Sequence, residues 1–141
     1  MKLPYIALAA AAVALLATPA QAQPGIVATQ LDSAVVLMAG QGFTPIDNAV
    51  TGTLPQGEDE EFELDLEAGR QYFVVGVCDG GCSDLDLVLT QGDNEVEADR
   101  ELDDVPMLAI QGQSGSFVLS VQMATCSSSQ CHYGVRVFGS R

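Results

Sequence analysis

Apolar and polar residues alternate along most of the chain after residue 49. Every second position is apolar in segments 62–66, 85–89, 117–123 and 133–137. A strand with one face in a core and the other in water has this period of two. Segment 72–77 is apolar throughout, which is typical of a central strand. With Gly- and Asp-rich turns between the segments, the pattern predicts an all-β fold, an antiparallel, jelly-roll-like β-sandwich of seven or eight strands.

One segment before residue 49 has a helical period instead. Its apolar residues follow the i, i+3, i+4, i+7 spacing of one helix face: Leu31, Ala34, Val35 and Met38. We expect Thr29 to cap the start of this short helix, with Asp32 in its first turn, where the helix dipole favours a negative charge. Gly40 and Gly42 are expected to end it. The helix is too short to persist unless it packs against the rest of the protein.

The first 22 residues have the pattern of a secretory signal peptide. Lys2 precedes a run of 12 apolar residues, 6–17, and Ala20-Gln21-Ala22 supplies the small residues that a signal peptidase recognises. Twelve apolar residues are too few for a membrane span, which needs about 20, although an uncleaved N-terminal anchor is the alternative. We therefore predict a cleaved signal (1–22), an N-terminal helix and linker (23–48) and a sandwich domain (49–141). The protein is expected to be periplasmic or extracellular.

The charge of the chain is strongly negative. It has 19 Asp and Glu against 5 Lys and Arg among 141 residues, a formal net charge of −14. Removing the signal peptide removes Lys2, so 4 Arg remain against 19 acidic residues and the net charge becomes −15. Nucleic acid and anionic membranes attract basic surfaces, so both are excluded as partners. The acidity favours either solubility as a monomer in a salty medium or carboxylates that converge on a cation.

Four cysteines lie in two close pairs within the exported part. Three residues separate Cys78 from Cys82, and four separate Cys126 from Cys131. An oxidising compartment favours disulfides, and four cysteines allow three pairings. We favour the two local bridges because the intervening segments are small and turn-prone, each bridge contributing about 2 kcal/mol in the chain-entropy model. A zinc site formed by all four thiolates is the competing interpretation.

Several segments, in order, resemble the bacterial pre-peptidase C-terminal domain, a β-sandwich appended to many secreted peptidases. The segments are Val50-Thr51-Gly52-Thr53-Leu54, 62–66, Ala68-Gly69-Arg70-Gln71-Tyr72, Asp84-Leu85-Asp86-Leu87-Val88-Leu89 and 115–121. The resemblance covers about residues 49–138. It implies a jelly roll without catalytic activity that assists secretion, localisation or substrate binding, and calcium binding in some members. The sequence departs from the family pattern in its two cysteine pairs and in having no peptidase domain before the module. We therefore expect a free-standing relative.

The strongest candidate site in the sequence is the acidic segment 78–86. Calcium prefers six to eight oxygen ligands, and Asp79, Asp84 and Asp86 are the predicted ligands, with Asp103 and Asp104 as further candidates from another loop. The Cys78–Cys82 bridge is expected to hold Asp79 near the other two carboxylates. The alternative is that these residues cap turns and hydrate a strand face.

No catalytic constellation is complete. His132 is the only histidine and follows Cys131, but a Cys–His pair needs a free thiol. Ser114 does not lie in a G-x-S-x-G motif. We therefore expect a non-catalytic binding or accessory module with no certain cofactor, whose partner is an unknown protein or an extracellular polymer. The alternative is a small secreted hydrolase with a carboxylate-based site. Without tryptophan and with seven aromatic residues in the exported part, a broad sugar-stacking platform is not expected, and Tyr72 and Tyr133 are the rings that could serve.

Overall fold

The computed structural model describes residues 24–141, so the predicted signal peptide lies outside the described residues. The described chain forms one helix followed by nine strands. Their bounds are α1 (Pro24–Gly40), β1 (Phe43–Pro45), β2 (Val50–Leu54), β3 (Asp59–Leu66), β4 (Tyr72–Cys78), β5 (Cys82–Gln91), β6 (Asn94–Asp99), β7 (Met107–Ile110), β8 (Gly115–Cys126) and β9 (Cys131–Ser140).

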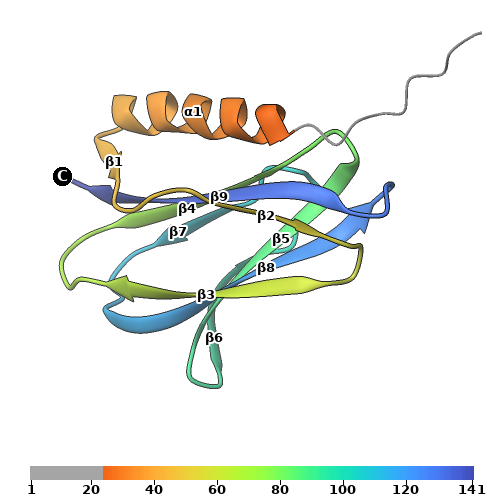
Figure 1. Cartoon of the computed structure of the whole chain (residues 1–141). Helices are drawn as coiled ribbons and strands as arrows, with labels where there is room; N and C mark the ends of the chain where they lie inside the picture. The colour runs from red at the N-terminus through yellow and green to blue at the C-terminus, as the bar shows by residue number, and fades with distance from the viewer. Residues whose placement is uncertain (1–23) are drawn as a thin grey trace, which may run out of the picture.

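Two antiparallel sheets pack face to face (Figure 1). In the five-stranded sheet, β1 and β2 both pair with one edge of β9, and β4 and β7 follow on its other side. The four-stranded sheet has the order β3-β8-β5-β6. From β2 to β9 the chain alternates between the sheets except at the β5–β6 hairpin and so follows a jelly-roll path. The predicted all-β sandwich with an N-terminal helix is confirmed.

The main core lies between the sheets and consists of the apolar residues that alternate along the strands. Leu85, Leu87 and Leu89 of β5 are completely buried there. On β8, Phe117, Val121 and their apolar neighbours face the same core. The period of two therefore identified the buried face of these strands correctly. This face is strongly specified, since a one-residue shift of a strand would turn every side chain to the other face.

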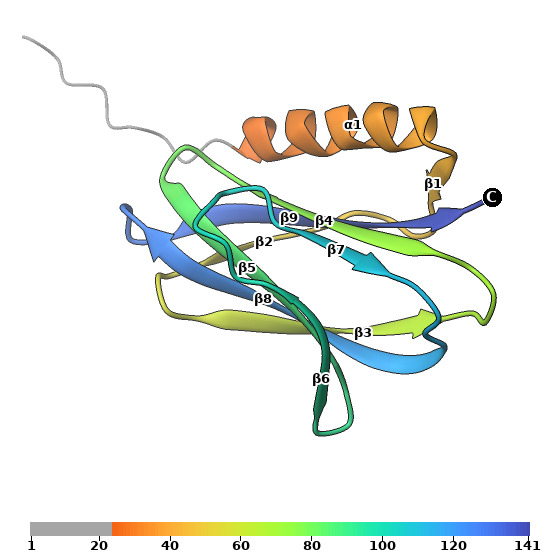
Figure 2. The same ribbon diagram turned by 180° about the vertical axis from the view of Figure 1, so that it is seen from behind.

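Helix α1 covers the outer face of the five-stranded sheet, where it packs on β9, β1 and β4 (Figures 1 and 2). Together they bury a second apolar cluster that includes Leu31, Met38, Val75 and Phe138. Gly134 of β9 permits this close approach, since a Cβ atom there would lie 2.6 Å from Cγ1 of Val27 and 2.7 Å from Cδ1 of Leu31.

The N-terminal part differs from the sequence prediction in two respects. The helix begins at Pro24 rather than near Thr29, whose hydroxyl donates to the carbonyl of Gly25 inside the helix. Proline is favoured at the first helical position because its fixed φ suits the helix. An N–H group at this position would have no partner within the helix, so its absence costs nothing. In addition, the segment expected to be a linker contains β1, which pairs with the end of β9. A three-residue strand is too short to show a period.

Gly134→Ala is expected to lower the free energy of unfolding by about 1–3 kcal/mol, because the new methyl group overpacks the contact between α1 and β9. Gly80→Ala is the matched control, since a Cβ atom at Gly80 meets nothing within 4 Å. Urea unfolding of both variants measures the difference. Equal stability of the two variants would show that α1 is not closely packed on β9.

Candidate functional site

Two disulfides lie together at one end of the sandwich. Cys78–Cys82 connects β4 to β5, and Cys126–Cys131 connects β8 to β9. Cys82 and Cys126 are also register partners on adjacent strands, so the two bridges are neighbours. The predicted local pairing is confirmed. All four cysteines are oxidised, so no thiolate is free to bind zinc as the competing interpretation requires. For the same reason, Cys131 cannot act as a nucleophile beside His132.

The Asp79 side chain joins these two loops and is only 6 % exposed. One carboxylate oxygen accepts a hydrogen bond from the Gly81 N–H at 3.0 Å, and the other accepts from the His132 N–H at 2.9 Å. A buried carboxylate needs such partners, and hydrogen bonds to a charged acceptor are among the stronger ones. Asp79 therefore holds the disulfide-bonded end together, and its oxygens are already occupied.

Asp84 and Asp86, unlike Asp79, have carboxylate oxygens without hydrogen-bond partners. They project from β5 on the face opposite the buried leucines, and in each residue Oδ1 is buried without a hydrogen-bond partner. Asp84 as a whole is 9 % exposed. Burial, followed by the neighbouring Asp84 carboxylate, raises the pKa of Asp86, while Arg100 opposes the shift. This pair of carboxylates is thus short of hydrogen-bond donors or positive charge.

The structure does not bring the three predicted calcium ligands together as a cluster. Within residues 24–141, no group of three or more His, Cys, Asp or Glu side chains has an arrangement that holds a metal ion. Of the additional candidates, Asp103 contacts β5 through its backbone carbonyl, which accepts from the Leu85 N–H, and Asp104 is exposed. Among these candidates, only Asp84 and Asp86 keep a buried carboxylate oxygen without a hydrogen-bond partner.

The residues considered for catalysis or sugar binding are separated or buried. Ser114 precedes β8, whereas His132 lies just after the turn that follows the far end of that strand. Tyr133 is fully buried and its hydroxyl donates to Glu60; burial and then this partner raise its pKa. Tyr72 is also buried. Neither ring is therefore available to stack on a sugar, because both belong to the core.

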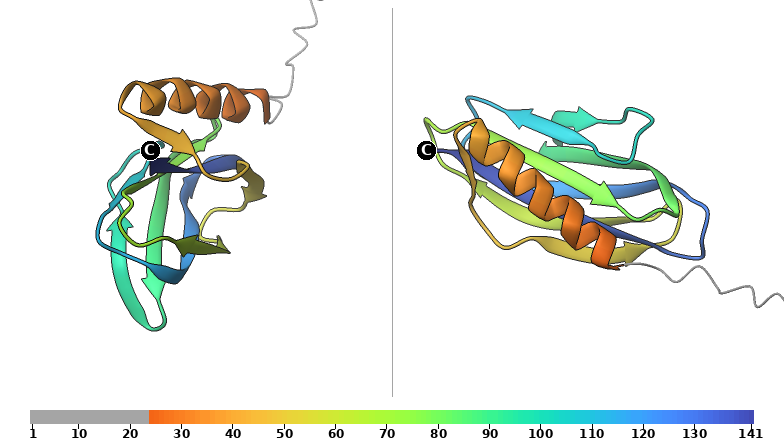
Figure 3. Two further views of the ribbon diagram at one scale, coloured as in Figure 1. Left: turned by 90° about the vertical axis from the view of Figure 1, so that its left-hand side faces the viewer. Right: turned by 90° about the horizontal axis from the view of Figure 1, so that it is seen from above.

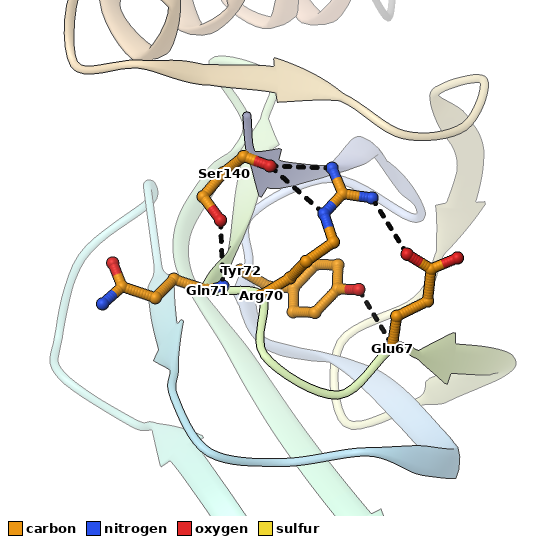
Figure 4. Close-up of polar contacts among 5 residues, drawn as sticks. All are labelled: Glu67, Arg70, Gln71, Tyr72 and Ser140. Carbon is orange, nitrogen blue, oxygen red and sulfur yellow. Dashed lines mark hydrogen bonds and ion pairs between the residues drawn. The ribbon is translucent and has the colours of Figure 1, made fainter.

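Tyr72 instead takes part in a polar network at the opposite end of the sandwich (Figure 4). Its hydroxyl accepts from the Glu67 N–H at 2.8 Å, which resembles the tyrosine corner of other β-sandwiches. The Arg70 guanidinium lies over the Tyr72 ring and donates through Nε and Nη2 to the Ser140 carbonyl. These contacts explain the Ala-Gly-Arg-Gln-Tyr segment as a structural motif that attaches β9 to the turn before β4.

An apolar groove remains beside α1. It has a volume of about 270 Å³, and its floor and walls come from α1, from β4 and from the segment that begins β7: Gln30, Ser33, Ala34, Leu37, Met38, Val75, Val77, Val105 and Met107. Four strands side by side span about 19 Å, whereas a helix with its side chains is about 10–12 Å wide. One helix therefore cannot cover the whole outer face of this sheet. In the right-hand view of Figure 3, α1 crosses the sheet and β7 lies to one side of it.

The rim of the groove consists of exposed apolar side chains. Leu37 is 60 % exposed, Val105 45 % and Met107 41 %. On the helix side, Oε1 of Gln30 is buried without a hydrogen-bond partner. Apolar side chains that adjoin one another at the rim of a concave surface are typical of a binding site.

Sequence reasoning missed this groove because its two walls are some 70 residues apart in the chain. The available signal was on the helix, where Ile26, Val36 and Leu37 are apolar but lie outside the predicted buried stripe. A helix that is apolar on more than one side is expected to have more than one partner.

Asp86→Asn is expected to raise stability at pH 7 and to flatten its pH dependence. A folded-state pKa above the unfolded value of about 3.9 means that the folded protein binds more protons in this range, so stability falls as pH rises from about 3.9 through the raised pKa. Thermal melts between pH 3 and pH 8 measure the effect, with Asp93→Asn in the exposed β5–β6 turn as the control. A parallel pH profile in wild type and Asp86→Asn would contradict it.

Within residues 24–141, no helix has the length and apolar content needed to cross a membrane. No protein-family model matches the sequence, and the search of curated proteins likewise gives no match.

Proposed function

We propose that this protein is a non-catalytic, exported binding module and that the groove between α1 and β7 is its binding surface. The observation that carries the proposal is the exposure of Leu37, Val105 and Met107 around a concave apolar floor. The chain has 19 acidic residues, yet no charged residue lines this groove. Such an apolar surface on an otherwise acidic protein is typical of a binding site.

The size of the groove indicates what it binds. Pockets for drug-sized ligands usually measure about 300–1,000 Å³ and enclose most of the ligand. A volume of about 270 Å³ between a helix and an edge strand suits one or two apolar side chains that project from a larger partner. A protein segment is therefore a better candidate than a small metabolite or a polysaccharide.

Export is supported by the two disulfides, which persist in oxidising compartments, and by the signal-like pattern of residues 1–22. We also propose kinship with the pre-peptidase C-terminal domain. The segments that carry this resemblance fall, in order, on β2, β3, the turn before β4, β5 and β8 of a jelly roll. An accessory role in recognising another exported protein agrees with both proposals.

Leu37→Ser is expected to weaken binding of the neutral apolar dye Nile red by about tenfold, because Leu37 forms part of the groove. Val36→Ser is the matched control: Val36 is more exposed, at 75 %, but it does not line the groove. Fluorescence titration of the exported chain measures the affinities. Absence of saturable binding, or equal weakening by the two substitutions, would refute a binding role for the groove.

We further propose that calcium acts at Asp84 and Asp86 rather than at all three predicted residues. Their two carboxylates, each with an unpaired oxygen, leave the remaining ligands to water and backbone carbonyls. A bound cation supplies the positive charge that this pair lacks.

Calcium at ten times its dissociation constant is expected to stabilise the protein by about 1.4 kcal/mol at pH 7, and Asp86→Asn should abolish the effect. Thermal melts in calcium, in magnesium and in chelator measure the stabilisation, with Asp93→Asn as the control. A melting temperature unchanged across millimolar calcium would exclude the site.

A further inference from the structure

We infer that the occupant of the groove is a segment of another protein in which apolar side chains are flanked by lysine or arginine. This inference rests on the proposed binding function and specifies the partner of the same surface. The reason is the unequal charge around the groove: carboxylates adjoin one wall, and no lysine or arginine lines the groove.

The wall that leads into β7 is acidic and held in place by its own backbone. Asp99 accepts hydrogen bonds from the N–H groups of Glu101 and Met107, and Asp103 accepts from the N–H of Val105. Asp104, next to Val105, is exposed. Two of the groove-lining residues, Val105 and Met107, are thus each bonded through their N–H to a carboxylate.

The only basic residue in this wall is already engaged. Arg100 donates through Nη1 and Nη2 to the two carboxylate oxygens of Glu95, at 2.9 and 2.6 Å. This ion pair leaves Asp99, Asp103 and Asp104 without a basic partner among the described ion pairs. A cationic side chain that approaches the wall is therefore attracted, although salt screens this attraction.

The opposite wall, formed by α1, is uncharged and mostly apolar, with two polar residues. It presents Gln30 and Ser33, and the buried Gln30 oxygen accepts no hydrogen bond. No lysine or arginine lines the groove. Lysine and arginine side chains combine an apolar stem with several N–H donors, so they match an apolar floor with acceptors at its edges.

A second copy of the chain matches this surface poorly. Each copy carries a net charge of about −15 after removal of the signal peptide, so two copies repel each other before their apolar rims meet. The four arginines of the exported chain also include Arg70 and Arg100, which are already paired with Glu67 and Glu95. Charge complementarity therefore favours a basic partner.

Three labelled 14-residue synthetic peptides test the inference. One has leucines at helical spacing with lysines between them, the second has glutamate in place of lysine, and the third has serine in place of leucine. Fluorescence anisotropy with the exported chain is expected to show at least tenfold tighter binding of the leucine–lysine peptide than of either other peptide. Its affinity should fall about tenfold between 50 and 500 mM NaCl, and the peptide should displace Nile red.

Matched variants locate the interaction. Asp103→Asn with Asp104→Asn should weaken the leucine–lysine peptide about threefold and leave Nile red binding unchanged, whereas Leu37→Ser should weaken both. Glu61→Gln with Glu63→Gln removes the same charge from exposed positions on β3 in the other sheet and should change neither. Equal weakening by the two charge pairs would overturn the inference in favour of general electrostatic attraction.

Two further outcomes also overturn it. Equal affinity for the leucine–glutamate peptide would mean that the acidic wall does not select the partner. A dimer in sedimentation velocity that Leu37→Ser dissociates would identify a second copy as the occupant. In both cases, saturable Nile red binding would leave the proposed binding function intact, whereas its loss would remove both proposals.

Discussion

A single helix is narrower than four strands side by side, and most features of this molecule follow from that mismatch. The five-stranded sheet is apolar on both faces, because β4 and β9 contribute side chains to the inter-sheet core and to the cluster beneath α1. Its outer face therefore needs a cover, which α1 provides mainly above β9, β1 and β4. The strip beside β7 stays open and becomes the groove. The candidate binding surface is thus a consequence of sheet width rather than of a dedicated loop.

The two ends of the sandwich are held by different chemistry. At one end, two disulfides and the buried Asp79 carboxylate connect the turns between β4 and β5 and between β8 and β9. At the other end, Arg70 and Tyr72 attach the last strand to the turn before β4. Both devices act on β4 and β9, the two central strands beneath α1. The platform on which the helix rests is consequently constrained at both ends.

Most strands were predictable because they bury one face, as Leu85, Leu87 and Leu89 illustrate, and a period of two is visible within a single segment. The disulfide pairing followed from short, turn-prone spacing. The helix start was wrong because a capping threonine and an interior threonine look alike in sequence, and their difference depends on Pro24. The role of Asp79 depends on which backbone N–H groups reach it from His132, which lies more than fifty residues away. The groove likewise depends on long-range packing of Leu37 near Met107.

The pairing of β9 has a consequence for the order of folding. β9 is the last strand of the fold, yet β1, β2 and β4 all pair with it and α1 rests on it. During synthesis from the N-terminus, α1 and these three strands therefore emerge before their common partner. Contacts between residues as distant as Phe43 and Ser140 have a high loop-closure cost, which slows folding. The five-stranded sheet therefore cannot assemble before β9 is available to join its strands.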